Sequence, residues 1–167
     1  MHKLLWGDRV KQKPWKTYAF WILLSEAIGA LSGWITREGT RIYSETITKP
    51  PLSPPAIVFP IAWGILYALM GNGAARIRLA PNSKEQQTGI NLFIAQLIVN
   101  FFWSPLFFNA QAFGFAFLWL LLRWVLVFWM ILTFRKTDRL SAILQIPYLI
   151  WLTFAAYLNL GVWYLNR

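Results

Sequence analysis

The sequence predicts an all-α integral membrane protein, a bundle of five transmembrane helices with its N-terminus in the cytoplasm. The chain of 167 residues is 57 % hydrophobic and 13 % charged, with a mean hydropathy of +0.46, which leaves too little polar surface for a soluble domain. Five apolar segments reach, or nearly reach, the roughly 20 residues that span hydrocarbon. A β-barrel is excluded because its strands would be shorter and would alternate apolar with polar residues.

The five expected helices follow one another along most of the chain. They span about residues 17–35, 56–75, 90–108, 112–134 and 140–163. A basic tail, residues 1–16, precedes them, so the membrane domain is expected at 17–167. A basic start before an apolar run resembles a signal peptide, but the four later apolar segments favour an uncleaved first helix.

The connections between these segments predict the topology. Residues 36–55 form a long outer loop and 76–89 a polar turn, whereas Asn109–Gln111 is so short that its flanking helices must form an antiparallel hairpin. Most of the 16 lysine and arginine residues fall in the tail, in 76–89 and in the loop before the last helix. The positive-inside rule places these segments in the cytoplasm. The net charge of +10 therefore indicates topology, and we expect no nucleic-acid partner.

The composition excludes several kinds of chemistry. There are no cysteines, and the single histidine is His2, so thiolate sites and a buried imidazole are absent. No phosphate-binding loop, dinucleotide motif, zinc-protease motif or Ser/His/Asp set occurs. We expect no catalytic residue, no metal site and no required cofactor. The absence of an organellar transit pattern favours a bacterial cytoplasmic membrane.

A proline cluster, residues 49–55, joins directly to the second apolar segment. Proline fixes φ and lacks an N–H group, so this cluster cannot form a regular helix. A rigid, non-helical segment against a membrane helix is suited to cover one end of a helix-lined cavity.

Two of the expected helices each place amides and aromatic side chains on one face. These residues are Gln96, Asn100, Trp103 and Phe107 in the third helix, and Trp151, Ala155 and Asn159 in the fifth. Buried amides usually bond across helices, which makes interhelical packing one interpretation. The other is a small-molecule cavity with a few polar anchors among aromatic residues. Trp63, inside the second helix, is open to the same two interpretations because a buried indole needs a partner for its N–H group.

Two charged residues fall near the middle of the membrane. Glu26 is about nine residues into the first helix and Arg123 about eleven into the fourth, which at 1.5 Å per residue brings both to a similar depth. Intramembrane charges normally pair or face water. We therefore expect Glu26 and Arg123 to form an ion pair, within one chain or across a dimer.

Three blocks of residues, in the second, third and fifth expected helices, resemble a known family. The blocks are Lys49-Pro50 with Pro54-Pro55, Phe59, Trp63, Leu66-Tyr67 and Met70-Gly71; Asn100 with Trp103 to Phe108; and Pro147 to Trp151 with Phe154-Ala155 and Leu158-Asn159. They resemble the signature of the TspO/MBR family, the translocator proteins, tryptophan-rich sensory proteins or peripheral-type benzodiazepine receptors. The resemblance covers roughly residues 18–166, and the order of the blocks makes it specific.

The resemblance implies a five-helix bundle, commonly a homodimer, with a ligand cavity under the loop between the first two helices. Family members bind porphyrins such as protoporphyrin IX and haem, benzodiazepine-site drugs and in some cases cholesterol. With the helix faces above, the expected ligand-binding residues are Pro54, Trp63, Asn100, Trp103, Phe107, Trp151 and Ala155. The expected lid residues are Tyr43, Lys49, Pro50 and Pro55.

The resemblance implies a membrane receptor or sensor for tetrapyrroles, with two alternatives. A transporter of porphyrins or sterol-like lipids is one, although no inverted repeat suggests alternating access. A light-dependent porphyrin-degrading enzyme is the other. The family often has Trp-Tyr shortly before Lys-Pro, where this chain has Tyr43-Ser44, and the missing indole argues against that activity. Without the usual histidine or cysteine ligand for haem iron in the bundle, metal-free porphyrin should bind about as well as haem.

Overall fold

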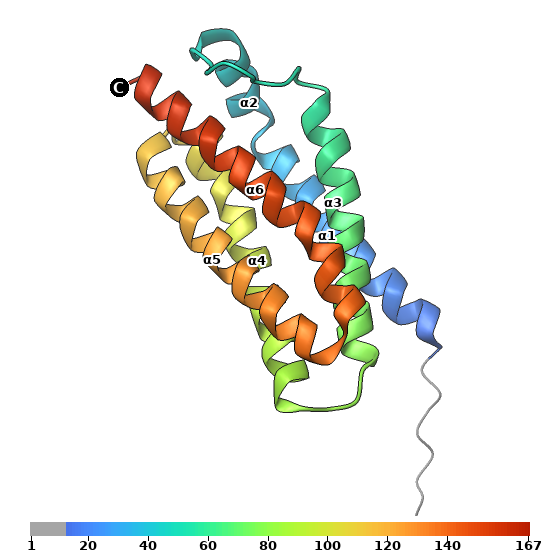
Figure 1. Cartoon of the computed structure of the whole chain (residues 1–167). Coiled ribbons are helices and arrows are strands. Elements are labelled where there is room, and N and C mark those ends of the chain that lie inside the picture. Colours follow the sequence, from blue (N-terminus) through green and yellow to red (C-terminus); the bar gives the residue numbers. More distant parts are fainter. Residues whose placement is uncertain (1–12) are drawn as a thin grey trace, which may run out of the picture.

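The computed structural model describes residues 13–167 and shows a bundle of long helices (Figure 1). Residues 1–12, most of the expected basic tail, lie outside the described part. The elements are α1 (Pro14–Ile35), α2 (Arg37–Thr46), α3 (Val58–Leu79), α4 (Lys84–Ser104), the π-helical turn η1 (Pro105–Asn109), α5 (Phe113–Thr137) and α6 (Arg139–Leu165). Five segments, α1, α3, α4 with η1, α5 and α6, are long and apolar enough to cross a membrane. The predicted all-α, five-helix class is confirmed, while the direction of the N-terminus stays a prediction.

The polar turn expected at 76–89 is much shorter than predicted. Helix α3 continues to Leu79, and α4 begins at Lys84 instead of residue 90. Ser83 caps α4 by accepting a hydrogen bond from the backbone N–H of Gln86 at 3.0 Å, which satisfies one of the free donors at a helix start. Apolar length predicts the part of a helix in hydrocarbon, but a capped helix extends past that boundary into water.

The outer loop expected at 36–55 also contains a helix, α2. Arg41 forms ion pairs with Glu38 one turn before it and Glu45 one turn after it, a spacing that supports a short exposed helix. Tyr43 packs inward from α2, its ring centroid 5.4 Å from that of Phe107 in η1. The non-helical part of the loop is therefore limited to residues 47–57.

The hairpin predicted around Asn109–Gln111 is confirmed as the connection between η1 and α5. The N–H of Ala110 bonds to the carbonyl of Pro105 at 2.9 Å, the wider spacing of a π-turn. Gln111 then turns the chain with a φ of 48°. The indole N–H of Trp119 in α5 donates to the carbonyl of Val99 in α4 at 2.8 Å, so the two helices lie side by side.

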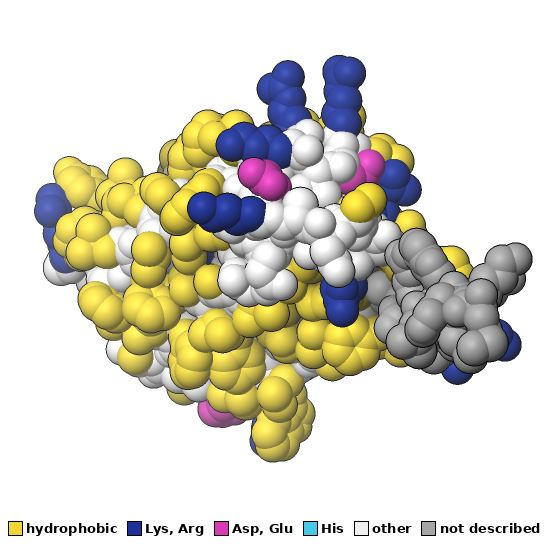
Figure 2. All heavy atoms as spheres, turned by 90° about the horizontal axis from the view of Figure 1, so that it is seen from below, with side chains coloured by type: hydrophobic (Ala, Val, Ile, Leu, Met, Phe, Trp, Pro, Cys, Tyr) yellow, Lys and Arg dark blue, Asp and Glu magenta, His cyan; other side chains and the backbone are white. Residues whose placement is uncertain are grey.

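Helix packing buries the centre of the bundle and leaves its flanks apolar. Gly71 of α3 lets α1 approach closely, because a Cβ atom there would lie 2.5 Å from the Cα of Ile22. The outward side chains of Leu23, Ile61 and Leu118 are 65 %, 58 % and 61 % exposed, as expected for a surface that contacts lipid. Figure 2 shows the lower end of the bundle, where lysine and arginine side chains gather around a polar area bordered by hydrophobic flanks.

Candidate functional site

A fully buried arginine of α5 lies among aromatic side chains of α3 and α4. Arg123 of α5 is 0 % exposed. Its guanidinium carbon lies 5.5 Å from the ring centroid of Trp63 in α3 and 5.4 Å from that of Trp103 in α4. Both distances are within the range of cation–π attraction. We call Arg123, Trp63, Trp103, Asn100 and Tyr67 the Arg123 cluster.

Hydrogen bonds join the polar members of the Arg123 cluster. The Nη1 atom of Arg123 donates to Oδ1 of Asn100, and the amide nitrogen of Asn100 donates to the hydroxyl of Tyr67 at 2.8 Å. The remaining Nε and Nη2 atoms of Arg123 have no hydrogen-bond partner within residues 13–167. Buried N–H groups without acceptors are costly, and more so on a charged group. The cluster therefore contains two buried hydrogen-bond donors, Nε and Nη2 of Arg123, without an acceptor among the described residues.

Further aromatic rings extend the cluster toward α6. The ring centroid of Trp63 lies 6.1 Å from that of Tyr148 and 6.4 Å from that of Trp151. Trp151 in turn meets Phe59 at 6.0 Å. Trp63 and Trp151 are each partly buried. Their edge-to-face contact joins α3 and α6.

Trp103 connects the Arg123 cluster to a second buried amide. Its indole N–H donates to Oδ1 of Asn159 in α6 at 3.3 Å, and the amide nitrogen of Asn159 donates to the carbonyl of Phe113 at 2.8 Å. The ring of Trp103 stacks on Phe107 with centroids 4.8 Å apart. Asn159 thus joins three helices, which supports the packing interpretation for this residue.

A parallel contact joins α4 and α6 one turn away from Asn100. The hydroxyl of Tyr148 donates to Oε1 of Gln96 at 2.9 Å, and both side chains are fully enclosed. Sequence reasoning singled out neither Tyr67 nor Tyr148 as a site residue. Tyr67 follows Trp63 by one helical turn, and this spacing could have indicated from the sequence that Tyr67 lies on the same helix face as Trp63.

The expected ligand-binding residues are partly assembled. Trp63, Asn100 and Trp103 meet at Arg123, while Trp151 joins through Trp63 and Phe107 through Trp103. Ala155 is partly buried one turn after Trp151, and Pro54 is partly buried in the lid loop. Their role in binding stays a prediction.

The lid loop is fastened to α6. The backbone N–H of Thr48 donates to Oδ1 of Asn166 at 3.0 Å, and the amide nitrogen of Asn166 donates to the carbonyl of Thr48 at 2.9 Å. Pro50 is buried and packs on Gly161, where a Cβ atom would lie 2.6 Å from the proline ring. The hydroxyl of Tyr157 donates to the carbonyl of Pro51 at 2.8 Å. The loop is held as a cover over the end of α6.

The other lid residues lie over α2 and at the surface. The ammonium group of Lys49 lies 5.5 Å from the ring centroid of Tyr43 and donates to the carbonyl of Ser44 at 3.3 Å. Burial raises the pKa of the Tyr43 hydroxyl, so it stays protonated near neutral pH. Pro55 is exposed, at the point where the loop leads into α3.

The expected ion pair between Glu26 and Arg123 is wrong within one chain. Arg123 bonds to Asn100, and the ion pairs of the described residues involve Arg41 and Arg76. Helix α1 packs on α3 and α4, whereas α5 packs on α4 and α6, so equal depth does not bring the two side chains together. Pairing of Arg123 with Glu26 of a second copy stays a prediction.

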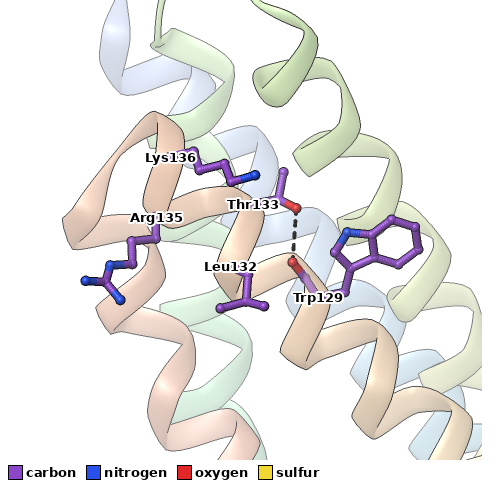
Figure 3. Close-up of a pocket in the computed structure, with 5 residues that line it drawn as sticks. All are labelled: Trp129, Leu132, Thr133, Arg135 and Lys136. Atoms are coloured by element: carbon purple, nitrogen blue, oxygen red, sulfur yellow. Dashed lines mark hydrogen bonds between the residues drawn. The ribbon is translucent and has the colours of Figure 1, made fainter.

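The hollow in Figure 3 lies away from these residues, near the end of α5. Its volume is about 520 Å³, and its lining comes from a single helix. The lining residues are Trp129, Leu132, Thr133, Arg135 and Lys136. A hollow along one helix is a surface groove and does not enclose a ligand. The ring contacts described above join α3 to α6. Among residues 13–167, no three His, Cys, Asp or Glu side chains are grouped to hold a metal ion.

Comparison with known proteins gives consistent matches over nearly the whole chain. Residues 21–165 match the model of the TspO/MBR family. The chain is similar to a translocator protein from Ovis aries, with 37 % identity over 92 % of each chain. It is also similar to the tryptophan-rich protein TspO of Chlorobaculum tepidum, with 33 % identity over 90 % of this chain and 96 % of the relative. A tryptophan-rich sensory protein of Cereibacter sphaeroides is 34 % identical over 73 % of this chain and 75 % of the relative.

Proposed function

The chain belongs to the TspO/MBR family as a multi-pass integral membrane protein, and from this premise we propose that it is a membrane receptor or sensor for a flat, amphipathic tetrapyrrole. Protoporphyrin IX is the model ligand. The site lies between α3, α4 and α6, under the lid loop. The name of the relative from Cereibacter sphaeroides, a tryptophan-rich sensory protein, supports a sensory role.

The observation that carries this proposal is the grouping of three partly buried indoles near a buried amide. The ring centroids of Trp63 and Trp103 lie 5.5 Å and 5.4 Å from the guanidinium carbon of Arg123, which Asn100 binds, and Trp151 packs edge-on against Trp63. Small-molecule sites combine large aromatic surfaces with a few placed polar groups. Aromatic faces stack on a tetrapyrrole ring, and the amide and guanidinium meet its polar substituents.

Ligand entry requires the aromatic side chains to separate. The rings contact one another at centroid distances of 4.8 to 6.4 Å, so a tetrapyrrole takes the place of some of these contacts. The three indoles are partly buried, and turning one of them opens a route under the lid loop. Contacts between the porphyrin ring and the aromatic side chains then replace the contacts that these side chains made with one another.

The test is a tryptophan-fluorescence titration of the purified protein in nanodiscs with metal-free protoporphyrin IX. The wild type should show saturable quenching at micromolar ligand. Trp151→Phe should weaken binding by about 2- to 10-fold, since an aromatic contact contributes about 0.5–1.5 kcal/mol. Asn100→Ala should weaken it as well. Trp129→Phe is the matched control, because Trp129 is an exposed indole in the α5 groove.

Linear quenching that is identical in all variants would mean that porphyrin only partitions into the lipid, and the proposal would fail. Haem should bind about as tightly as the metal-free ring. Light- and oxygen-dependent loss of porphyrin absorbance would point to degradation. Accumulation of porphyrin inside proteoliposomes would identify transport in place of sensing.

A further inference from the structure

We propose that Arg123 binds a carboxylate of the ligand, so that the site selects flat hydrophobic anions over neutral molecules of the same shape. The inference rests on the proposed function, because it takes the Arg123 cluster as the ligand site. It adds the chemical class that the cluster recognises and the residue that determines it.

The geometry of the free donors leads to this assignment. Nη1 of Arg123 is occupied by Asn100, and the two nitrogens without partners in the described chain are Nε and Nη2. These two nitrogens form the side edge of the guanidinium, whose parallel N–H groups match the two oxygens of a carboxylate. A hydrogen-bonding edge of this shape, fully enclosed and without an acceptor among residues 13–167, matches a planar bidentate acceptor.

The acidic side chains of the described chain leave that edge free. Glu38 and Glu45 pair with Arg41, and Asp138 pairs with Arg76. Glu26 lies on α1 and Glu85 in the first turn of α4, and neither forms an ion pair within residues 13–167. A buried intramembrane charge is costly unless it is paired. A ligand carboxylate bound to Nε and Nη2 would supply the negative charge that the buried guanidinium lacks.

The surrounding indoles favour a carboxylate that is attached to a flat apolar body. Trp63 and Trp103 cover the guanidinium at 5.5 and 5.4 Å, so a ligand reaches Arg123 only after one of these partly buried rings turns aside. A flat ring system can replace the displaced indole over the guanidinium. A neutral ligand of the same shape would leave the N–H edge without an acceptor, and such unpaired polar groups are the main source of discrimination in buried sites.

The experiment compares acids with their esters, which have the same ring and no charge. Protoporphyrin IX and its dimethyl ester form one pair, and 1-pyrenebutyrate and its methyl ester form a smaller pair that does not depend on tetrapyrrole binding. Each is titrated against the protein in zwitterionic nanodiscs, with tryptophan quenching as the readout. The variants are Arg123→Gln and, as a matched control, Arg37→Gln, because Arg37 is an exposed arginine 4.9 Å from the ring of Trp34.

The wild type should bind each acid about 10- to 100-fold more tightly than its ester, the factor expected for hydrogen bonds to a charged group. Arg123→Gln should abolish this preference while it keeps ester binding, which also shows that the variant is folded. Arg37→Gln should behave as wild type.

Equal binding of acid and ester by the wild type would overturn the inference, and the free edge of Arg123 would then be satisfied by internal water. An acid preference that survives Arg123→Gln would overturn it as well. If pyrenebutyrate shows the Arg123-dependent preference but protoporphyrin IX does not bind, the inference holds and the tetrapyrrole proposal fails. If no carboxylate binds saturably, both fail.

Discussion

Asn100 should be the most sensitive polar residue of the bundle. Its side chain is 3 % exposed. Within residues 13–167, its Oδ1 atom accepts the hydrogen bond that Arg123 donates. Asn100→Leu keeps the approximate side-chain volume and leaves the guanidinium without an acceptor. Removing one partner of a hydrogen bond to a buried charge costs about 2–4 kcal/mol. Neutral hydrogen bonds in membrane proteins average about 0.6 kcal/mol, so the expected loss is clearly above that level.

The assay is reversible unfolding in mixed detergent micelles, combined with a double-mutant cycle between Asn100→Leu and Arg123→Met. The double variant should be less destabilised than the sum of the single variants by about 1.5 kcal/mol or more, because removing the charge also removes its need for an acceptor. Gln96→Leu is the control. Gln96 is equally buried on α4 but accepts from the neutral hydroxyl of Tyr148, so its loss should be about 1 kcal/mol and additive with Arg123→Met. Additive losses for Asn100 and Arg123 would refute the pairing.

Two further predictions concern the lid and the opposite end of the bundle. Gly161→Val should displace the lid loop, because its Cβ would lie 2.6 Å from Pro50; hydrogen exchange in residues 47–57 should accelerate, whereas Gly33→Val, with open space around it, should leave it unchanged. The hydrogen bond from Arg76 lowers the pKa of Asp138 from its ordinary 3.8 to about 2, so this carboxylate stabilises the fold above pH 4, and the contribution is lost as the pH falls from about 4 to 2. Solvent screening of the partly exposed pair limits the loss to on the order of 1 kcal/mol; thermal unfolding across this range should show it in the wild type, and an unchanged acid sensitivity in Asp138→Asn would contradict it.

The number and order of the helices could be predicted from the sequence because hydrocarbon imposes a length and an apolar composition on any helix that crosses it. The hairpin at Asn109–Gln111 followed from connection length alone. The extension of α4 back to Lys84 and the existence of α2 could not be predicted in this way. Both depend on local polar contacts, the Ser83 cap and the Arg41 ion pairs, which hydropathy does not measure.

The sequence by itself predicted that Arg123 lies near the middle of the membrane, and that Asn100 and Trp103 share one face of their helix. Depth follows from position along a helix, and a shared face follows from spacing along it. Only the tertiary structure decided which side chain meets which. The rotation and neighbours of each helix are set by packing, which places α4 between α1 and α5 and joins Arg123 to Asn100 in place of Glu26. The same packing leaves Nε and Nη2 of Arg123 without a hydrogen-bond acceptor among residues 13–167. The surroundings of these two atoms depend on three helices at once, so residue spacing along a single helix does not predict them.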